Sequence, residues 1–481
     1  MHTIGISRKQ VRLASWEDFV PADSPARQID RFVDEMDTSY FLFSSHDTVG
    51  RRPYNPKDML KLFLYGNDKG VFSSRKLERE CRENVIVFWL LNGLQPESKT
   101  ICNFRRNNAE NLNRFFSEFA RKLVRDGYID GKVVGLDGTK IRANNSGNNN
   151  FNLKRVTAKI EKAEKQIADY MSEVDKNDKL DGLVSKHEKL VSIKQRIENG
   201  ETEVSTTDPD SRMMKMPNGG KNVCHNVQSA VDSKNKMIAG FKVVSNQNDQ
   251  GLLHSVAKEV KENLGLKKMM VTADTGYFDA DEIEKCHLDN IETLITALEP
   301  HKNSELYTKK DFVFDEQIDA YLCPAGQKLT LAAISNDTKH YRNIKACKDC
   351  PLKSKCTKGV YRTVSHHVKY ETVKRNAYAL VKNAEKHRLR GALCEHPFGT
   401  IKHNMRFVQF LLRTNPKVSG EAALFFTVYN LKRLRNLSNN NLPCAQTQAI
   451  LEKLRFLFAF VALAISVFGF ISKKFLRKPQ N

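Results

Sequence analysis

The feature that most constrains the fold is a series of short apolar runs, rich in β-branched residues, in the middle of the chain. Their length and composition favour strands, and helical patterns separate several of them. The runs cover residues 132–138, 223–232, 237–246, 267–277 and 291–298. Strands that alternate with helices within one stretch predict a mixed α/β sheet rather than a helical bundle.

The part of the chain before these runs has helical periodicity. Predicted helices cover residues 25–36, the run after Asn55-Pro56, and residues 74–82, 84–92, 98–108 and 109–127. Arg105 and Arg106 would project from the short helix within 98–108. Short helices with basic residues on the last one are what a helix-turn-helix reader of DNA needs, and an ordinary bundle with a solvated basic face is the alternative. Residues 1–130 are therefore predicted to form a helical, DNA-binding N-terminal domain.

Two apolar stripes interrupt the strand-rich region. From residue 153 to residue 174 apolar side chains follow a 3-4 spacing, and a second stripe covers residues 183–197. The polar stretch 175–182 between them reads as a turn. The pattern predicts an antiparallel helical hairpin inserted at residues 146–200, with a structural or self-associating role, in which His187 packs on the apolar face.

Three acids lie where chemistry at a sheet edge would need them. Asp137 and Asp274 each close a predicted strand and are followed within two residues by glycine, and Glu395 precedes Pro397, which places it at or just before a helix start. Three converging carboxylates require divalent cations, and their hard oxygens select Mg²⁺ or Mn²⁺. Two such ions can clamp the oxygens of an in-line phosphoryl transfer. On pattern grounds two other acids compete for the second position: Asp232 and Asp249.

A cysteine cluster lies between the strand-rich region and the last acid. A CxxC pair and two further thiols can close a tetrahedral Zn²⁺ site, which would be structural. Redox or disulfide chemistry, helped by neighbouring lysines, is the competing interpretation. The four candidate ligands are Cys323, Cys347, Cys350 and Cys356, within a predicted insertion at 300–385.

Charge and hydropathy restrict the partners and the location. Lys and Arg number 78 against 56 Asp and Glu, a net charge of +22, which favours a polyanionic partner such as nucleic acid. The first residues contain no apolar run of signal-peptide type, so a cytoplasmic protein with reduced thiols is expected. The uncharged run 456–471, in the predicted tail 436–481, is borderline for a spanning helix. A buried helix or strand pair is favoured over membrane contact.

Four sequence blocks, in this order, resemble those of bacterial insertion-sequence transposases of the DDE class: VVGLDGTKIRAN, TDPDSRMM, VTADTGYF and EHPFGTIK. The resemblance covers residues from about 15 to 436. It implies an RNase H-like catalytic domain over 131–435, in which Asp137, Asp274 and Glu395 bind two Mg²⁺ ions and cut and then join DNA strands. Lys402, seven residues after Glu395, matches the Glu-x6-Lys element of the family and would hold a phosphate.

The sequence departs from the family pattern at one position. The family places an arginine four residues before the glutamate, whereas this chain has Gly391 there, with Arg388 and Arg390 nearby. Together with Lys402 and Arg406, these two arginines are the candidate DNA contacts of the C-terminal region.

The resemblance implies double-stranded DNA as partner, both element ends and target, a homodimer on that DNA, and a nucleoid-associated location. Two alternatives stay open: an RNase H-like metal nuclease without strand transfer, and an inactive DNA-binding relic.

Overall fold

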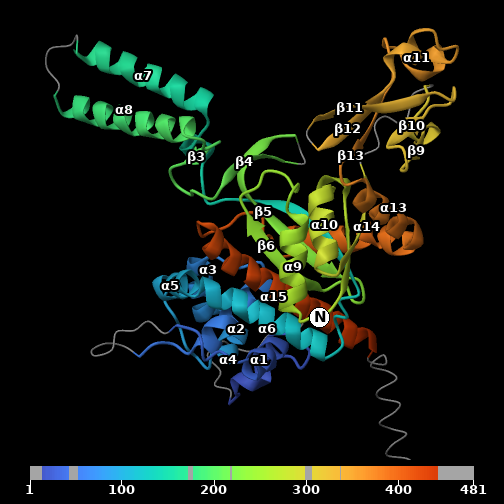
Figure 1. Cartoon of the computed structure of the whole chain (residues 1–481). Coiled ribbons are helices and arrows are strands. Elements are labelled where there is room, and N and C mark those ends of the chain that lie inside the picture. The colour runs from blue at the N-terminus through green and yellow to red at the C-terminus, as the bar shows by residue number, and fades with distance from the viewer. Residues whose placement is uncertain are drawn as a thin grey trace, which may run out of the picture. The chain divides into compact units, whose positions relative to one another are not determined.

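The N-terminal region is helical (Figure 1). The computed structural model describes residues 13–42, 52–171, 177–216, 219–297, 306–335 and 337–441. Helices α1 and α2 both begin with proline after a capping side chain, since Ser24 and Asn55 accept hydrogen bonds from the backbone N–H groups of Ala26 and Lys57. The helices are η1 Trp16–Phe19, α1 Pro25–Glu35, α2 Pro56–Asp68, α3 Ser74–Glu83, α4 Val85–Leu90, α5 Ser98–Asn107 and α6 Ala109–Arg125.

The centre of the molecule is a mixed sheet with the strand order β6-β5-β1-β7-β8, in which β4 also pairs with β5. Strand β5 pairs antiparallel with both β1 and β6, whereas β1, β7 and β8 run parallel. This order and these directions form the RNase H-like sheet that was predicted. The strands are β1 Val133–Arg142, β4 Arg212–Lys215, β5 Lys221–Asp232, β6 Ile238–Val244, β7 Met269–Ala273 and β8 Ile291–Ile295.

Helices pack against this sheet and connect it to the N-terminal region. Helix α14 contacts β1, β5 and β7, while α9 contacts β5 and β6. Phe116 of α6, Phe241 of β6 and Phe426 of α15 form an edge-to-face cluster that joins the first helices to the core. The helices are α9 Leu253–Asn263, η3 Thr275–Tyr277, α10 Ala280–Leu288, α13 Tyr370–Lys382, α14 Ala384–Gly399, the π-helix η5 Thr400–Asn404 and α15 Asn415–Asn441.

The first insertion is a helical hairpin, as predicted. Helices α7 and α8 lie side by side in Figure 1 and share a small core with residues next to them. Two details differ from the prediction: Leu153 is exposed, and α8 begins at Asn177, so most of the predicted turn is helical. His187 lies half-buried, 3.2 Å from Glu164. The elements are η2 Gly147–Asn149, β2 Asn150–Phe151, α7 Leu153–Met171, α8 Asn177–Glu198 and β3 Val204–Ser205.

The second insertion carries its own antiparallel sheet, with the order β13-β12-β11-β10-β9. Its core contains Phe312, Tyr321, Leu329, Tyr341 and Val364. It enters the chain between β8 and α13, before the helix that carries Glu395. The elements are η4 Lys309–Asp311, β9 Val313–Asp315, β10 Ala320–Leu322, β11 Lys328–Ser335, β12 Thr338–Arg342, α11 Ile344–Lys348, α12 Lys353–Cys356 and β13 Thr363–His367.

One compact unit extends to Tyr429, and the site described below lies within it. No helix among the described residues is both long and apolar enough to span a membrane. The apolar run 456–471 lies outside the described residues.

Candidate active site

The strand register brings two of the predicted acids to the same edge of the sheet. Strands β1 and β7 pair in parallel from Val133–Met270 to Gly135–Thr272. Two residues further along the chain in each case come Asp137, within β1, and Asp274, directly after the end of β7; both are half-buried. The Oδ1 atom of Asp274 accepts a hydrogen bond of 2.9 Å from the N–H of Gly276 and so caps η3.

The charges at this edge interact. Burial raises the pKa of the Asp137 carboxyl to about 6, although the N–H of Gly138 opposes the shift. The negative charges of Asp274 and Asp249 raise the pKa of Asp137 further, and Arg390 lowers it. The charges of Asp274, Asp249 and Arg390 therefore all reach Asp137, and a divalent cation would relieve the repulsion among the carboxylates.

Helix α14 brings Glu395 to the same part of the sheet. A Cβ on Gly135 of β1 would lie 3.1 Å from Leu393 Cβ and 3.2 Å from Cys394 Sγ, so helix and strand are in close contact. The Cys394 thiol donates to the carbonyl oxygen of Leu136 at 3.5 Å. Burial raises the pKa of this thiol to about 12, and the charges of Asp137, Asp274 and Glu395 add to the effect. Glu395, the next residue, is exposed.

Two side chains attach α13 and α14 to the end of the sheet. The amide of Asn376 accepts from the N–H of Ile295 at 3.3 Å and donates to its carbonyl at 2.7 Å, so α13 is bound to β8. The imidazole of His387 lies 3.0 Å from the hydroxyl of Thr272 on β7 and 3.2 Å from that of Thr296. These contacts fix the start of the helix that carries Glu395.

The prediction that Glu395 lies at a helix start was wrong. Helix α14 begins at Ala384, so Glu395 lies near its C-terminal end and Pro397 is inside the helix. A proline inside a helix removes one backbone hydrogen bond and distorts the turn. Here the chain changes into the π-helical turn η5 immediately afterwards, and that turn carries Lys402.

Lys402 reaches back to the strand that carries Asp137. Its Nζ donates to the hydroxyl of Thr139 at 2.5 Å and to the carbonyl of Lys140 at 3.3 Å. Burial lowers the pKa of the Lys402 ammonium, and the negative charge of Asp137 opposes that shift. The ammonium group of Lys402 is thus bound to Thr139, which is two residues after Asp137 on β1, although Lys402 itself belongs to η5.

The competing acids lie in different places. Asp232 pairs with Val134 at the opposite end of β1, where its carboxylate accepts the backbone N–H groups of Gly131 and Lys234. It therefore supports a turn away from the site. Asp249, in the loop after β6, lies beside Gly138 and is part of the site's surroundings.

The predicted DNA contacts differ in exposure. Arg105 is only 3% exposed, and its guanidinium donates to the carbonyl of Phe72 and the hydroxyl of Ser74. Arg105 is therefore part of the interior of the N-terminal region, and the prediction that it contacts DNA was wrong. Arg106, Arg388 and Arg406 are exposed, and Arg390 is half-buried.

Asp137 and Asp274 supply hard oxygen ligands whose charges repel each other, which suits Mg²⁺. Within the described ranges, however, no three His, Cys, Asp or Glu side chains are grouped closely enough to hold one metal ion. The carboxylate pair thus fits a divalent cation by its chemistry, and a closed three-ligand cage is not formed.

The four cysteines of the insertion line one small cavity. They surround a space of about 30 Å³ next to Phe312, and all four are free thiols. Burial raises the pKa of the Cys356 thiol, and charge on the other three cysteines raises it further. In the part of the chain that the structure describes, these cysteines do not lie close enough together to form a metal-binding group.

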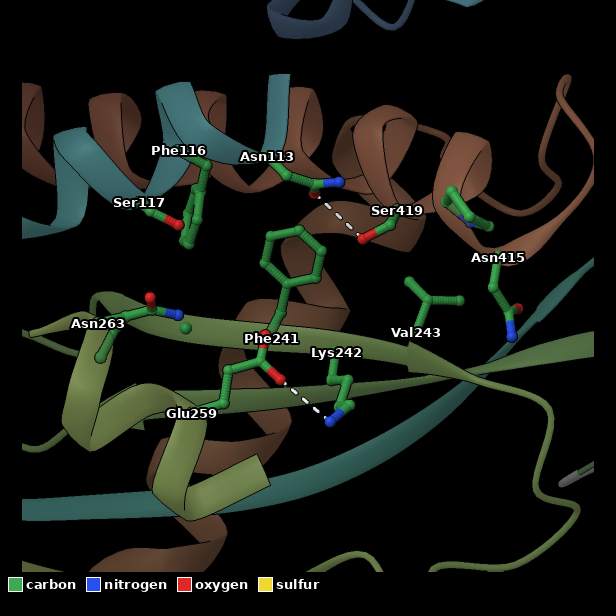
Figure 2. Close-up of a pocket in the computed structure, with 13 residues that line it drawn as sticks. Asn113, Phe116, Ser117, Phe241, Lys242, Val243, Glu259, Asn263, Asn415 and Ser419 are labelled. Atoms are coloured by element: carbon green, nitrogen blue, oxygen red, sulfur yellow. Dashed lines mark hydrogen bonds and ion pairs between the residues drawn. The ribbon is translucent and has the colours of Figure 1, made fainter. Parts of the chain in front are cut away.

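A larger cavity, of about 300 Å³, lies elsewhere, between α6, β6, α9 and α15 (Figure 2). In it Lys242 pairs with Glu259 at 3.0 Å, and the Ser419 hydroxyl donates to Asn113 at 3.1 Å. None of the predicted catalytic acids lines this cavity.

Comparison with known proteins identifies the class. The family described as "Transposase domain (DUF772)" matches residues 14–107, and the family described as "Transposase DDE domain" matches residues 322–435. These two matches support an insertion-sequence transposase of the DDE type. The second match includes Glu395 and Lys402 and begins just before Cys323.

Other comparisons add little. No curated protein matches the chain. Among solved structures, the piggyBac transposase synaptic complex with hairpin DNA is similar at 8% identity, with 86% of this chain and 71% of that chain covered. Its TM-score of 0.32 is too low to support a conclusion.

Proposed function

We propose that this transposase binds the ends of an insertion sequence and catalyses metal-dependent strand cleavage and strand transfer at the Asp137–Asp274 edge of the sheet. The observation that carries the proposal is the parallel register of β1 and β7, which puts both carboxylates at one edge, with the Glu395 helix packed against β1. Water, and then a DNA 3′-hydroxyl, would be the nucleophile.

In this proposal Asp137 and Asp274 hold Mg²⁺ or Mn²⁺, and Glu395 completes the ligand set. When bound, the ions would stabilise charge on the attacking and leaving oxygens of a phosphodiester. Lys402, held beside β1 by Thr139, would hold a phosphate of the scissile strand. Arg106, Arg388, Arg390 and Arg406 are the proposed contacts to the DNA backbone, and two chains would act together on two DNA ends.

The test is a cleavage assay on DNA fragments that carry the sequence flanking this reading frame, with Mg²⁺ or Mn²⁺. Wild type is compared with Asp137→Ala, Asp274→Ala and the control Glu292→Gln, which changes an exposed acid on the neighbouring strand β8. We expect discrete cuts at the element ends, and joined products with a target duplex, in wild type and control only. Cuts that survive Asp137→Ala would contradict the assignment of the site.

The same assay separates the alternatives. Cleavage without joined products would favour the metal nuclease, and DNA binding without cleavage in any metal would favour the inactive relic. Light scattering of the protein with and without end DNA would test the proposed dimer.

We propose in addition that Cys323, Cys347, Cys350 and Cys356, which line one cavity but, among the described residues, are not spaced as a formed metal site, close around a structural zinc ion when it binds. Metal analysis of protein purified without chelators should find about one zinc per chain. Cys350→Ser should reduce the zinc content, and Cys102→Ser, which changes a half-buried thiol outside the insertion, should not. Equal zinc content in both variants, or none in wild type, would contradict this proposal.

A further inference from the structure

The residue after Asp137 is closely packed by two polar side chains. Gln228 of β5 lies directly opposite Gly138 in the β1–β5 register. A Cβ at position 138 would lie 2.5 Å from Asp249 Oδ1 and closer still to the amide nitrogen of Gln228. Position 138 therefore requires glycine because protein side chains already fill the space beside it.

These side chains belong to a hydrogen-bonded chain. The Tyr277 hydroxyl donates to Gln228 Oε1, and Gln228 Nε2 donates to Asp249 Oδ1 at 2.7 Å and to Asn226 Oδ1 at 3.0 Å. Asn226 in turn donates to Asp249 Oδ1 at 2.9 Å. Because Gln228 uses both ends of its amide, its orientation is determined by its partners.

The chain of hydrogen bonds connects the surroundings of both aspartates. Tyr277 is the last residue of η3, the helical turn that Asp274 caps. At the other end, Asp249 lies against the residue that follows Asp137. Tyr277 is 0% exposed and Gln228 1% exposed. A buried polar network of this kind is rigid when complete and costly when one member is missing.

We propose that Tyr277, Gln228 and Asp249 are positioning residues that hold the Asp137 and Asp274 carboxylates at the separation that a divalent cation needs. They act through η3 and through the backbone at Gly138, without touching the DNA. The inference rests on the proposed function and deepens it, since it assigns the geometry of the carboxylate pair to Gln228 on β5, Tyr277 on η3 and Asp249 in the loop after β6.

The experiment measures Mn²⁺ binding to the full chain by calorimetry and, in parallel, the Mn²⁺ concentration that gives half-maximal cleavage of the flanking DNA. Tyr277→Phe removes only the hydroxyl that donates to Gln228, and Asp249→Asn removes only the charge. Both should weaken Mn²⁺ binding about 10- to 100-fold, the usual effect of losing a partner of metal ligands. Affinity for the DNA in Ca²⁺ should change little, and the melting temperature should fall no further than in a control variant that loses a comparable buried hydroxyl hydrogen bond.

The control is Tyr341→Phe, which also removes a hydroxyl hydrogen bond from a buried tyrosine, but in the cysteine-bearing insertion. If Tyr277→Phe and Asp249→Asn bind Mn²⁺ as tightly as wild type, the positioning proposal is overturned while the proposed function stands. The same holds if Tyr341→Phe weakens binding equally. If wild type neither binds Mn²⁺ nor cleaves, the proposed function fails and the positioning proposal fails with it.

Discussion

Two adjacent arginines on α5 have different tasks. The Arg105 guanidinium donates to Phe72 at 2.8 Å, lies over the ring of Phe63, and brings its charge near the buried carboxyl of Glu421. Arg106 is exposed and donates hydrogen bonds to two asparagines of its own helix, Asn103 and Asn107. The sequence shows two basic residues on a helix, and which of them points inward depends on packing against α2 and α15.

Arg105→Ala and Arg106→Ala should therefore affect different properties: the first the stability of the fold, the second the binding of DNA. Arg105→Ala should lower the free energy of unfolding by about 2–4 kcal/mol, because it leaves buried polar groups without their partner. Arg106→Ala should change the stability by less than about 0.5 kcal/mol and weaken DNA binding. Urea unfolding and fluorescence anisotropy measure the two quantities. Equal stability of both variants would contradict the internal role of Arg105.

Asp137→Asn should stabilise the metal-free protein at pH 7.5. The pKa of Asp137 is raised to about 6 in the fold, mainly by burial, against 3.8 ordinarily. Below about pH 4 the carboxyl is neutral in both the folded and unfolded states, and the cost of its charge develops as the pH rises to about 6. For a half-buried group this cost is about 1–2 kcal/mol.

Thermal melting with and without Mg²⁺ checks this prediction. Wild type should gain stability from Mg²⁺ at pH 7.5, and Asp137→Asn should gain little. At pH 4 the two metal-free proteins should melt alike. If Asp137→Asn melted at a lower temperature than wild type at pH 7.5 without metal, the charge of Asp137 would not destabilise the fold, and the prediction would be wrong.

Among the elements, the strands of the site are more predictable than its helices. Asp137 and Asp274 follow short β-branched runs, and that pattern alone places them at strand ends. No local pattern predicts the position of Glu395 within a helix. Pro397 suggests a helix start, whereas α14 contains this proline and packs against β1. The sequence does not predict that Gln228 and Tyr277 belong to the site, since neutral polar residues in a strand or turn have no pattern of their own.

The sheet of the cysteine-bearing insertion should weaken in acid. Burial lowers the pKa of His366 from 6.5 to about 4, and the charges of Lys309 and Lys339 add to the shift. Its imidazole lies 2.9 Å from the hydroxyl of Tyr321 and 3.2 Å from that of Tyr341. The stability that the neutral ring contributes is complete above about pH 6.5 and is lost as the pH falls toward 4, a change of about 1–2 kcal/mol after solvent screening is counted.

Hydrogen exchange of the amides in β10 to β13, corrected for the intrinsic effect of pH, should show this loss between pH 7 and pH 5. In His366→Phe the ring cannot take up a proton, so protection should change little over that range. An equal loss in both proteins would assign the effect to another group.

For the whole molecule, the excess of positive charge predicts how DNA binding depends on salt. The net charge of +22 is spread over the chain, so many phosphates can be neutralised at once. A protein that contacts about 6–10 phosphates loses about 10³- to 10⁵-fold in affinity between 50 and 200 mM salt. We expect this steep dependence for any duplex, and tighter binding at equal slope for the flanking DNA.

Single substitutions make that expectation specific. Arg106→Ala and Arg388→Ala should each reduce the slope of log affinity against log salt by about 0.9, because each removes one phosphate contact of the proposed interface. Lys189→Ala, which removes an exposed charge from the hairpin helix α8, should leave the slope unchanged. Anisotropy titrations on labelled flanking and random duplexes measure all three. If Lys189→Ala reduced the slope as much as Arg388→Ala, the hairpin would belong to the DNA-binding surface, and the proposed interface would have to be extended to it.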